Sequence, residues 1–287
     1  MAVDNEIKTQ KESKLIDVDN VILSKSPTLH KWLPKFVVNK LKKIIHQDEI
    51  NDFISRNRHL YGHDFVNAII TEFGADVDYS GIENINENKR YIIASNHPLG
   101  GLDGIALLWV VGKKNKNIVF PVNDLLMYLD NLSELFIPIN KHGSNKDNVK
   151  IIEDTFASDK TILYFPAGLC SRKQNKVICD LTWKKTFIKK AVTYKRDIIP
   201  CYINAANSKK FYNIASLRKK LGIKANIEMI YLPDEMYKQK GKHFSITFGS
   251  PIPYSTFDNR YNDTEWAQKV KEFVYSLKTN PDGKFMQ

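Results

Sequence analysis

The sequence lacks a long hydrophobic run and has few cysteines. No apolar stretch approaches the roughly 20 residues that a helix needs to cross a bilayer, and the longest, at 105–112, has the length of a buried helix. The first residues contain no apolar region of the kind found in secretory signals. The chain has three cysteines and no CxxC pair (Cys170, Cys179 and Cys201), which predicts neither a disulfide framework nor a zinc site. We therefore expect a reducing, cytoplasmic setting and only peripheral contact with a membrane.

Acidic residues are fewer than basic residues. The 287 residues include 43 Lys and Arg against 32 Asp and Glu, which gives a formal charge of +11 and a pI of about 9.3. Such an excess favours an anionic partner, whether nucleic acid, an anionic membrane or an acidic substrate. One strongly basic segment, 209–224, also contains Phe211 and Tyr212. Aromatic residues among cations suit anionic lipid or nucleic acid, although a surface helix with one buried stripe has the same pattern. Because no nucleic-acid-binding motif is visible, lipid or an acidic carrier protein is preferred.

Most of the chain alternates between strand-length and helix-length segments. Short apolar runs occur at 75–81, 91–95, 118–122, 135–139, 161–165, 198–203, 227–231 and 244–248. Segments of helical length separate most of them, at 104–114, 147–158, 183–195 and 209–222, and a last one lies at 263–278. This alternation predicts an α/β domain over 75–287, with a mixed, largely parallel central sheet flanked by helices.

The residues before this domain have a different pattern. Residues 1–25 are polar, which predicts a mobile tail, and 26–74 predict a helical extension. Within the extension, apolar residues recur at helical spacing over 28–47 while lysines fill the other face, and Trp32 and Pro34 stand near its start. A helix of this kind lies flat on anionic lipid or packs on its own domain with a solvated lysine face.

One segment carries residues suited to catalysis. The strand at 91–95 runs directly into Asn96 and His97, two glycines follow, and a helix begins near Asp103. The ligand crevice of an open α/β sheet lies beyond the carboxyl ends of its strands. A carboxylate there can hold one histidine nitrogen protonated and leave the other as a base. Taken alone, the pair is better explained by a helix-capping aspartate and a turn histidine than by catalysis.

At this point the chain resembles the lysophospholipid acyltransferase family, which includes the glycerol-3-phosphate acyltransferases. The segment NHPLGGLDG is similar to the first family motif, and three later segments follow in the family order: FIPINKHGSNKD (136–147), LYFPAGLCSRK (163–173) and IIPCYI (198–203). The five residues between His97 and Asp103, where the family commonly has four, are shared with its hemolysin-like branch. That branch includes enzymes that O-acylate ornithine and glycine lipids.

The resemblance implies a role for each motif. His97 is the expected base and Asp103 its orienting partner, acting on a lyso-lipid hydroxyl with an acyl carrier protein or coenzyme A thioester as donor. The thiolate leaves readily, so no metal or other cofactor is expected. Backbone amides of 165–168 are candidates for binding the oxyanion. Arg172, whose fork matches phosphate or carboxylate, and then Lys141 are expected to bind an anionic group. The remaining substrate-binding candidates in these motifs are Asn96, Gly100, Gly101, Gly168 and Ser171.

The third motif departs from the family pattern. Ala167 stands where most members have glutamate, and Leu169 where this branch tends to have another acidic residue.

Taken together, the sequence predicts an O-acyltransferase bound peripherally to the cytoplasmic side of an anionic membrane. A catalytically idle lipid-binding protein of the same fold, and a nucleic-acid-binding protein suggested by charge alone, are the alternatives.

Overall fold

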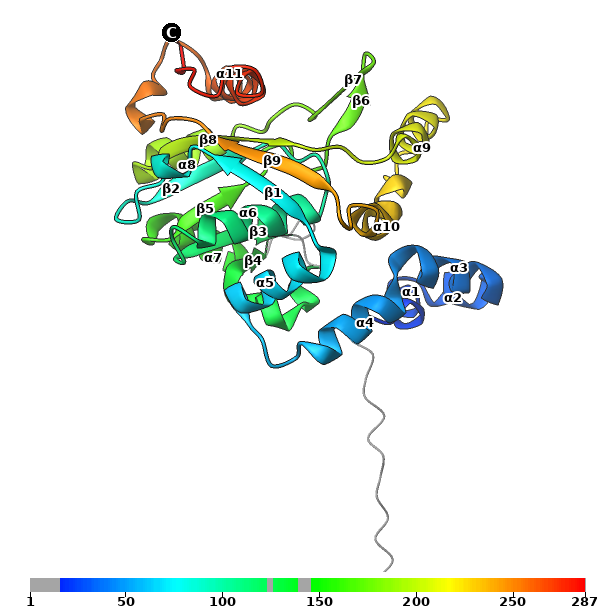
Figure 1. Cartoon of the computed structure of the whole chain (residues 1–287). Coiled ribbons are helices and arrows are strands. Elements are labelled where there is room, and N and C mark those ends of the chain that lie inside the picture. Colours follow the sequence, from blue (N-terminus) through cyan, green and yellow to red (C-terminus); the bar gives the residue numbers. More distant parts are fainter. Residues whose placement is uncertain (1–15, 123–125, 139–145, 287) are drawn as a thin grey trace, which may run out of the picture. The chain divides into compact units, whose positions relative to one another are not determined.

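The computed structural model describes residues 16–122, 126–138 and 146–286 (Figure 1). The chain forms two compact units, Met1–Asn57 and Arg58–Gln287. The boundary between them falls inside the extension that the sequence predicts over 26–74. In the described part of the chain, no helix combines the length and the apolar character needed to cross a membrane.

The described part of the first unit consists of short helices. They are α1 (Val18–Lys25), α2 (Pro27–Trp32), α3 (Lys35–Ile45) and α4 (Gln47–Arg56). The helix α1 was not predicted, because the polar first 25 residues suggested a tail. Its first residue, Val18, is buried, and the Val18 N–H donates to the Gln47 side chain (2.9 Å), so α1 is tied to α4.

The prediction of a single helix over 28–47 is wrong. The structure ends α2 at Trp32 and begins α3 at Lys35. Leu33 is extended, with φ −71° and ψ 122°, as expected for a residue before proline, because the Pro34 ring disfavours helical geometry there. Trp32 and Phe36 flank this break and are 81% and 73% exposed.

The second unit is built on a seven-stranded sheet with the order β1-β9-β8-β2-β5-β3-β4. Its strands are β1 (Asp76–Ser80), β2 (Tyr91–Ser95), β3 (Ile118–Val122), β4 (Phe136–Pro138), β5 (Thr161–Tyr164), β8 (Asp197–Asn204) and β9 (His243–Phe248). All neighbours pair in parallel except β8 and β9. The predicted fold class, α/β with a largely parallel sheet flanked by helices, is confirmed.

Helices cover both faces of this sheet. The helices of the second unit are α5 (Gly62–Phe73), α6 (Leu102–Gly112), α7 (Lys146–Ala157), α8 (Thr186–Tyr194), α9 (Lys209–Lys220), α10 (Leu232–Tyr237) and α11 (Asp263–Ser276). Val119 of β3 belongs to a core cluster with α8 and α11. The next residue, Phe120, contacts Gly104 of α6. Because successive strand residues point to opposite faces, α6 lies on the face opposite α8 and α11.

Two short regions differ from the prediction. The apolar run 227–231 was predicted as a strand, but it forms the 3-10 helix η4 (Ile227–Tyr231). Its second residue, Glu228, is fully buried and ion-paired to Arg172 and Arg218, whereas Ile227 and Ile230 are exposed. Side-chain pairing and not a strand ladder therefore fixes this segment. A hairpin of β6 (Arg172–Gln174) and β7 (Val177–Cys179) was not predicted.

Candidate active site

The candidate site lies at the carboxyl ends of three neighbouring strands, β8, β2 and β5. Asn96 directly follows β2, and its side chain bonds both backbone groups of Ile203 in β8, donating to the oxygen (2.9 Å) and accepting from the nitrogen (2.7 Å). Asn96 is buried. Its amide therefore fixes the end of β2 against β8, and this anchors the residue that comes next, His97.

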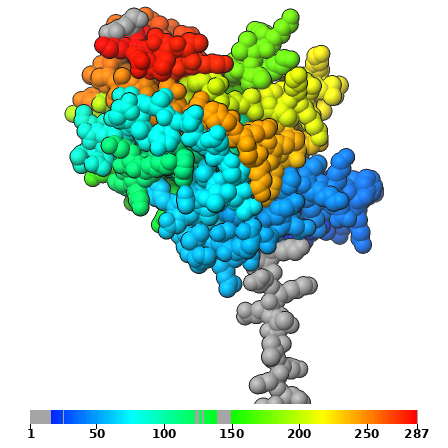
Figure 2. Space-filling model, viewed as in Figure 1, coloured from blue at the N-terminus to red at the C-terminus, as the bar shows by residue number. Residues whose placement is uncertain are grey.

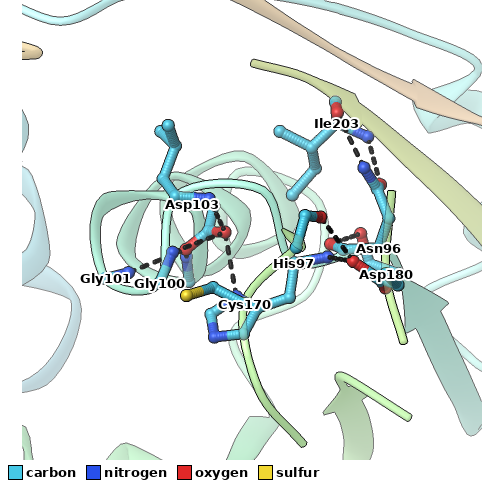
Figure 3. A network of polar contacts seen from close by, with 12 residues as sticks. Asn96, His97, Gly100, Gly101, Asp103, Cys170, Asp180 and Ile203 are labelled. Atoms are coloured by element: carbon cyan, nitrogen blue, oxygen red, sulfur yellow. Dashed lines mark hydrogen bonds and ion pairs between the residues drawn. The ribbon is translucent and has the colours of Figure 1, made fainter. Parts of the chain in front are cut away.

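His97 and Asp103 are in direct contact, as the sequence predicts. The distance from His97 Nδ1 to Asp103 Oδ2 is 2.9 Å (Figure 3). Asp103, in the first turn of α6, is fully buried, whereas the His97 side chain is 17% exposed. The other ring nitrogen, Nε2, has no hydrogen-bond partner among the described residues. The pair thus presents an imidazole with one nitrogen held and one nitrogen open.

Backbone N–H groups surround the Asp103 carboxylate. Oδ2 accepts from Leu99 (2.8 Å) and Gly100 (3.2 Å), and Oδ1 accepts from Gly101 (3.0 Å) and Gly104 (2.9 Å). Burial opposes ionisation of Asp103, but His97 and the N–H groups of the loop outweigh it and lower the pKa of Asp103. Since the carboxylate is ionised and accepts only, His97 Nδ1 must be the donor, which leaves Nε2 as the basic nitrogen.

The loop between β2 and α6 needs glycine at one position. Gly100 has φ +82°, and a Cβ there would lie 2.8 Å from Leu232 and 3.1 Å from the sulfur of Cys170. A side chain would therefore combine left-handed strain with a clash. Gly101 has φ −165°, an extended value open to other residues. The backbone conformation of the loop therefore requires glycine at position 100 but not at position 101.

Asp180 is a further residue of the site, and the sequence did not point to it. Its Oδ1 accepts from the His97 N–H (3.2 Å) and the Ser171 hydroxyl (2.6 Å), and its Oδ2 accepts from Trp183 Nε1 (2.9 Å). The side chain is fully buried, and burial raises the pKa of Asp180. The Ser171 N–H in turn donates to the His97 oxygen (2.7 Å). Asp180 and Ser171 therefore hold both backbone polar groups of His97.

The third motif lies against the histidine ring. Phe165, directly after β5, stacks on His97 with ring centroids 4.0 Å apart and an angle of 18° between the planes. Ala167 is buried in the core cluster beneath α8 and α11, so the position usually held by glutamate here serves packing. The Gly168 N–H donates to the Phe165 oxygen (3.0 Å) and is already committed to the turn, although it was one of the amides expected to bind an oxyanion.

Arg172, expected to bind an anionic group, is buried and bonded to the protein. Nε and Nη2 donate to Glu228 Oε1 (3.1 and 3.0 Å), Nη1 donates to the Cys170 oxygen (2.6 Å), and the guanidinium lies over the Phe211 ring. The Cys170 thiol is also fully buried, and burial raises its pKa to about 11. Because the thiolate is the nucleophilic form, Cys170 is unsuited to covalent catalysis.

Two further expectations concern an anion-binding lysine and the absence of a metal ion. Lys141, the basic candidate of the second motif, lies outside the described residues. For metal binding, the described part of the chain contains no group of three or more His, Cys, Asp or Glu side chains placed to hold an ion. The described site therefore consists of His97, Asp103, Asp180, Ser171 and the surrounding loops.

Comparison with known proteins supplies independent information. A family model described as "Acyltransferase" matches residues 20–283. The chain is 50% identical over 265 residues to a lyso-glycine lipid O-acyltransferase of Bacteroides thetaiotaomicron, covering 92% of this chain and 97% of that protein. It is 48% identical over 265 residues to a protein of the same name from Phocaeicola vulgatus, covering 92% and 95%. A solved structure, the 1-acyl-sn-glycerophosphate acyltransferase PlsC of Thermotoga maritima, is similar with a TM-score of 0.45 and 17% identity over 92% of this chain and 90% of that one.

Proposed function

The chain belongs to the acyltransferase family, and from this premise we propose that it carries a fatty acyl group from a thioester to the hydroxyl of a lyso-lipid, with His97 as the base. The observation that carries this proposal is the pairing of His97 Nδ1 with the buried Asp103 carboxylate while Nε2 stays open. A histidine held in this way suits proton removal from an alcohol at neutral pH. Transfer of an acyl group from a thioester to an alcohol requires such a step, because the alcohol is a poor nucleophile until it loses its proton.

In the proposed reaction, His97 Nε2 takes the hydroxyl proton as the acceptor oxygen attacks the thioester carbonyl. The ionised Asp103 stabilises the resulting imidazolium and keeps the ring in one orientation. When the tetrahedral intermediate collapses, the carbon–sulfur bond breaks, and the imidazolium returns the proton to the departing thiolate. The products are an ester and a free thiol, and His97 is again neutral.

The acceptor we propose is a lyso-glycine lipid. The support is that two relatives, 48–50% identical over 92% of this chain, are named lyso-glycine lipid O-acyltransferases. The donor is an acyl carrier protein or coenzyme A thioester, since a thiolate leaves more readily than an alkoxide. The substrate site is shaped by loop residues and by Asn96 behind them; the loop residues are Gly100, Gly101, Gly168, Ser171 and Arg172. Arg172 contributes by fixing the loop, because its guanidinium is already bonded within the protein.

The first unit is proposed to bring the enzyme to its substrate. Trp32 at the end of α2 and Phe36 at the start of α3 are largely exposed, and α3 carries several lysines. Exposed aromatic residues beside cations suit the interface of an anionic membrane. We infer peripheral binding on the cytoplasmic side, where acyl thioesters are made.

An acceptor panel tests the proposal. Purified protein is incubated with an acyl carrier protein thioester or an acyl-CoA, and with a lyso-glycine lipid, a lyso-ornithine lipid or a lysophosphatidate, and products are identified by mass spectrometry. We expect the acylated glycine lipid to form fastest. Faster turnover of lysophosphatidate would contradict the choice of acceptor, and absence of any product with either donor would contradict catalysis and favour an idle lipid-binding protein.

A further inference from the structure

The hairpin β6–β7 carries exposed apolar side chains at its end. Val177 is 62% exposed and Ile178 40% exposed, and Lys173 and Lys176 are exposed beside them. Residues 172–179 contain no aspartate or glutamate. The end of the hairpin is therefore apolar and positively charged.

A second exposed apolar segment lies at the end of α9. Leu217 is 57% exposed, Leu221 65% and Ile223 40%. Exposed lysines at positions 219, 220 and 224 alternate with them, and residues 209–227 contain no acidic residue. The helix end repeats the combination found on the hairpin.

The two segments are neighbours in the second unit. Arg172 at the base of the hairpin lies over Phe211 of α9 and is ion-paired to Glu228 of η4, which also pairs with Arg218 of α9. Figure 2 shows the hairpin in green and α9 in yellow as adjacent projections. We call their exposed apolar and lysine side chains the apolar-basic surface.

This surface is connected to the candidate site through a single residue. Arg172 begins the hairpin, and the residue before it, Ser171, donates its N–H to the His97 oxygen. A membrane held against the apolar-basic surface would thus lie beside the loop that contacts the catalytic histidine. A lyso-lipid hydroxyl would then need only a short path out of the bilayer.

We propose that the apolar-basic surface is a lipid-contact surface of the catalytic unit, which inserts Val177 and Leu221 into an anionic bilayer so that the acceptor reaches His97. This inference rests on the proposed function for its choice of partner. Apolar side chains buried at the headgroup boundary and lysines attracted to anionic lipid together provide interfacial binding.

The exposed aliphatic side chains favour a bilayer over other anionic partners. Among the described residues, Leu221 and Val177 are the most exposed large aliphatic side chains. An acidic carrier protein or a nucleic acid would account for the lysines, because charge drives such contacts. Neither partner would explain why these two apolar side chains are exposed at projecting ends, whereas a bilayer would bury both.

Site-specific labelling tests the proposal in the full chain. An environment-sensitive fluorophore is attached to Val177→Cys or Leu221→Cys in a Cys179→Ser background, in which the remaining thiols, Cys170 and Cys201, are buried. The control is Val192→Cys on α8, at a site that is 42% exposed. With vesicles of equal phosphatidylglycerol and phosphatidylcholine, we expect emission at 177 and 221 to shift to the blue and rise at least twofold, and emission at 192 to stay unchanged.

Three results would overturn the proposal. They are unchanged emission at 177 and 221 on vesicle-bound protein, a failure of the protein to bind these vesicles, and a response to an acyl carrier protein or an oligonucleotide in place of vesicles. The labels do not depend on binding by Trp32 or Phe36, because they report the surroundings of their own sites.

A second experiment separates this surface from catalysis. We expect Val177→Asp combined with Leu221→Asp to weaken vesicle binding at least fivefold and to lower turnover of a vesicle-embedded acceptor, while turnover of a short-chain acceptor dissolved as monomers stays within twofold of wild type. The matched control is Val192→Asp, with no loss in either assay. His97→Ala should lose turnover yet keep the fluorescence response. A response without any turnover would refute the proposed function alone, and unchanged vesicle binding by the double variant would refute this surface alone.

Discussion

At the scale of single residues, Asp103 shows how a buried carboxylate remains ionised. Four backbone N–H groups and the His97 ring donate to its two oxygens. These donors outweigh the burial that opposes charge, so the pKa of Asp103 is lowered in the folded protein. The same contacts that fix the histidine therefore also contribute to folding stability, and the contribution depends on pH.

Replacement of Asp103 by asparagine should expose this dependence. The unfolded chain binds the Asp103 proton near pH 4, whereas the folded chain binds it only at lower pH. The stabilisation is therefore fully present above the pKa of Asp103 in the unfolded chain. It is lost as the pH falls through the lower pKa of Asp103 in the folded chain. We expect the difference in free energy of unfolding between wild type and Asp103→Asn, measured by urea titration, to be largest at pH 6–7 and to shrink below about pH 4. A difference that stays constant down to pH 3 would contradict this account.

Asp180 is predicted to act as a positioning residue. An amide in place of its carboxylate puts an NH₂ group against at least one of its donors, which are the His97 N–H, the Ser171 hydroxyl and Trp183 Nε1. We expect Asp180→Asn to lower kcat by about tenfold or more with KM unchanged, and to lower the free energy of unfolding by about 1–3 kcal/mol. The control is Asp78→Asn, at an exposed position paired with His243, where both quantities should remain close to wild type. A normal kcat in a destabilised Asp180→Asn would reduce Asp180 to a structural role.

The sequence revealed only part of this residue network. His97 and Asp103 are six positions apart and follow a strand, so a local pattern could pair them. Asp180 is 83 positions from His97, and it follows a hairpin that no hydrophobic pattern predicts. Arg172 was expected to be available to an anion, but the sequence could not show that Glu228, 56 positions away, would take its guanidinium.

At the scale of elements, the loop from β2 to α6 depends on its backbone conformation. Gly100→Ala would place a Cβ at φ +82° and within 3.1 Å of both Leu232 and Cys170. We expect this variant to lose most activity, because the loop must move and its N–H groups leave Asp103. Gly74→Ala is the matched control, since Gly74 also has positive φ (+52°) but has nothing within 4 Å. That control should cost about 1 kcal/mol in thermal or urea unfolding and retain full activity. Equal activity in both variants would contradict the account.

The predictability of elements followed the strength of their patterns. The strand β2 is buried at every position, so its continuous apolar run was a reliable signal. The run 227–231 has a similar composition, yet its buried member is Glu228 and two of its isoleucines are exposed. The β6–β7 turn places Asn175 and Lys176 at φ 47° and 71°, where glycine would usually signal a hairpin. Without that glycine, three-residue strands gave no recognisable pattern.

At the scale of the whole molecule, the order of four weak motifs carried more information than any one of them. Each motif is short, but together they identified the acyltransferase family, and the family is confirmed by the match over 20–283 and by relatives that cover 92% of the chain. The α/β fold with its largely parallel sheet is confirmed as well. The division into a helical extension and a catalytic domain stays a prediction about function.

The first unit is predicted to strengthen membrane binding. Trp32 and Phe36 are the two most exposed large hydrophobic residues in the described part of the chain, so replacing both by serine removes apolar area without emptying a core. We expect Trp32→Ser with Phe36→Ser to weaken binding to anionic vesicles by about tenfold in cosedimentation and to leave the melting temperature unchanged. Tyr61→Ser, at a position 56% exposed in the second unit, is the control and should bind normally. Unchanged vesicle binding by the double variant would remove the membrane role of this unit.

The most direct test of the central claim is the rate of ester formation by His97→Ala. The enzyme is given an acyl thioester and a lyso-glycine lipid dispersed as monomers, so that membrane binding does not enter, and product is followed by mass spectrometry. If His97 removes the hydroxyl proton, the variant should be folded, as judged by circular dichroism, and slower than wild type by at least about a hundredfold. A folded His97→Ala that acylates the lipid at the wild-type rate would contradict the account.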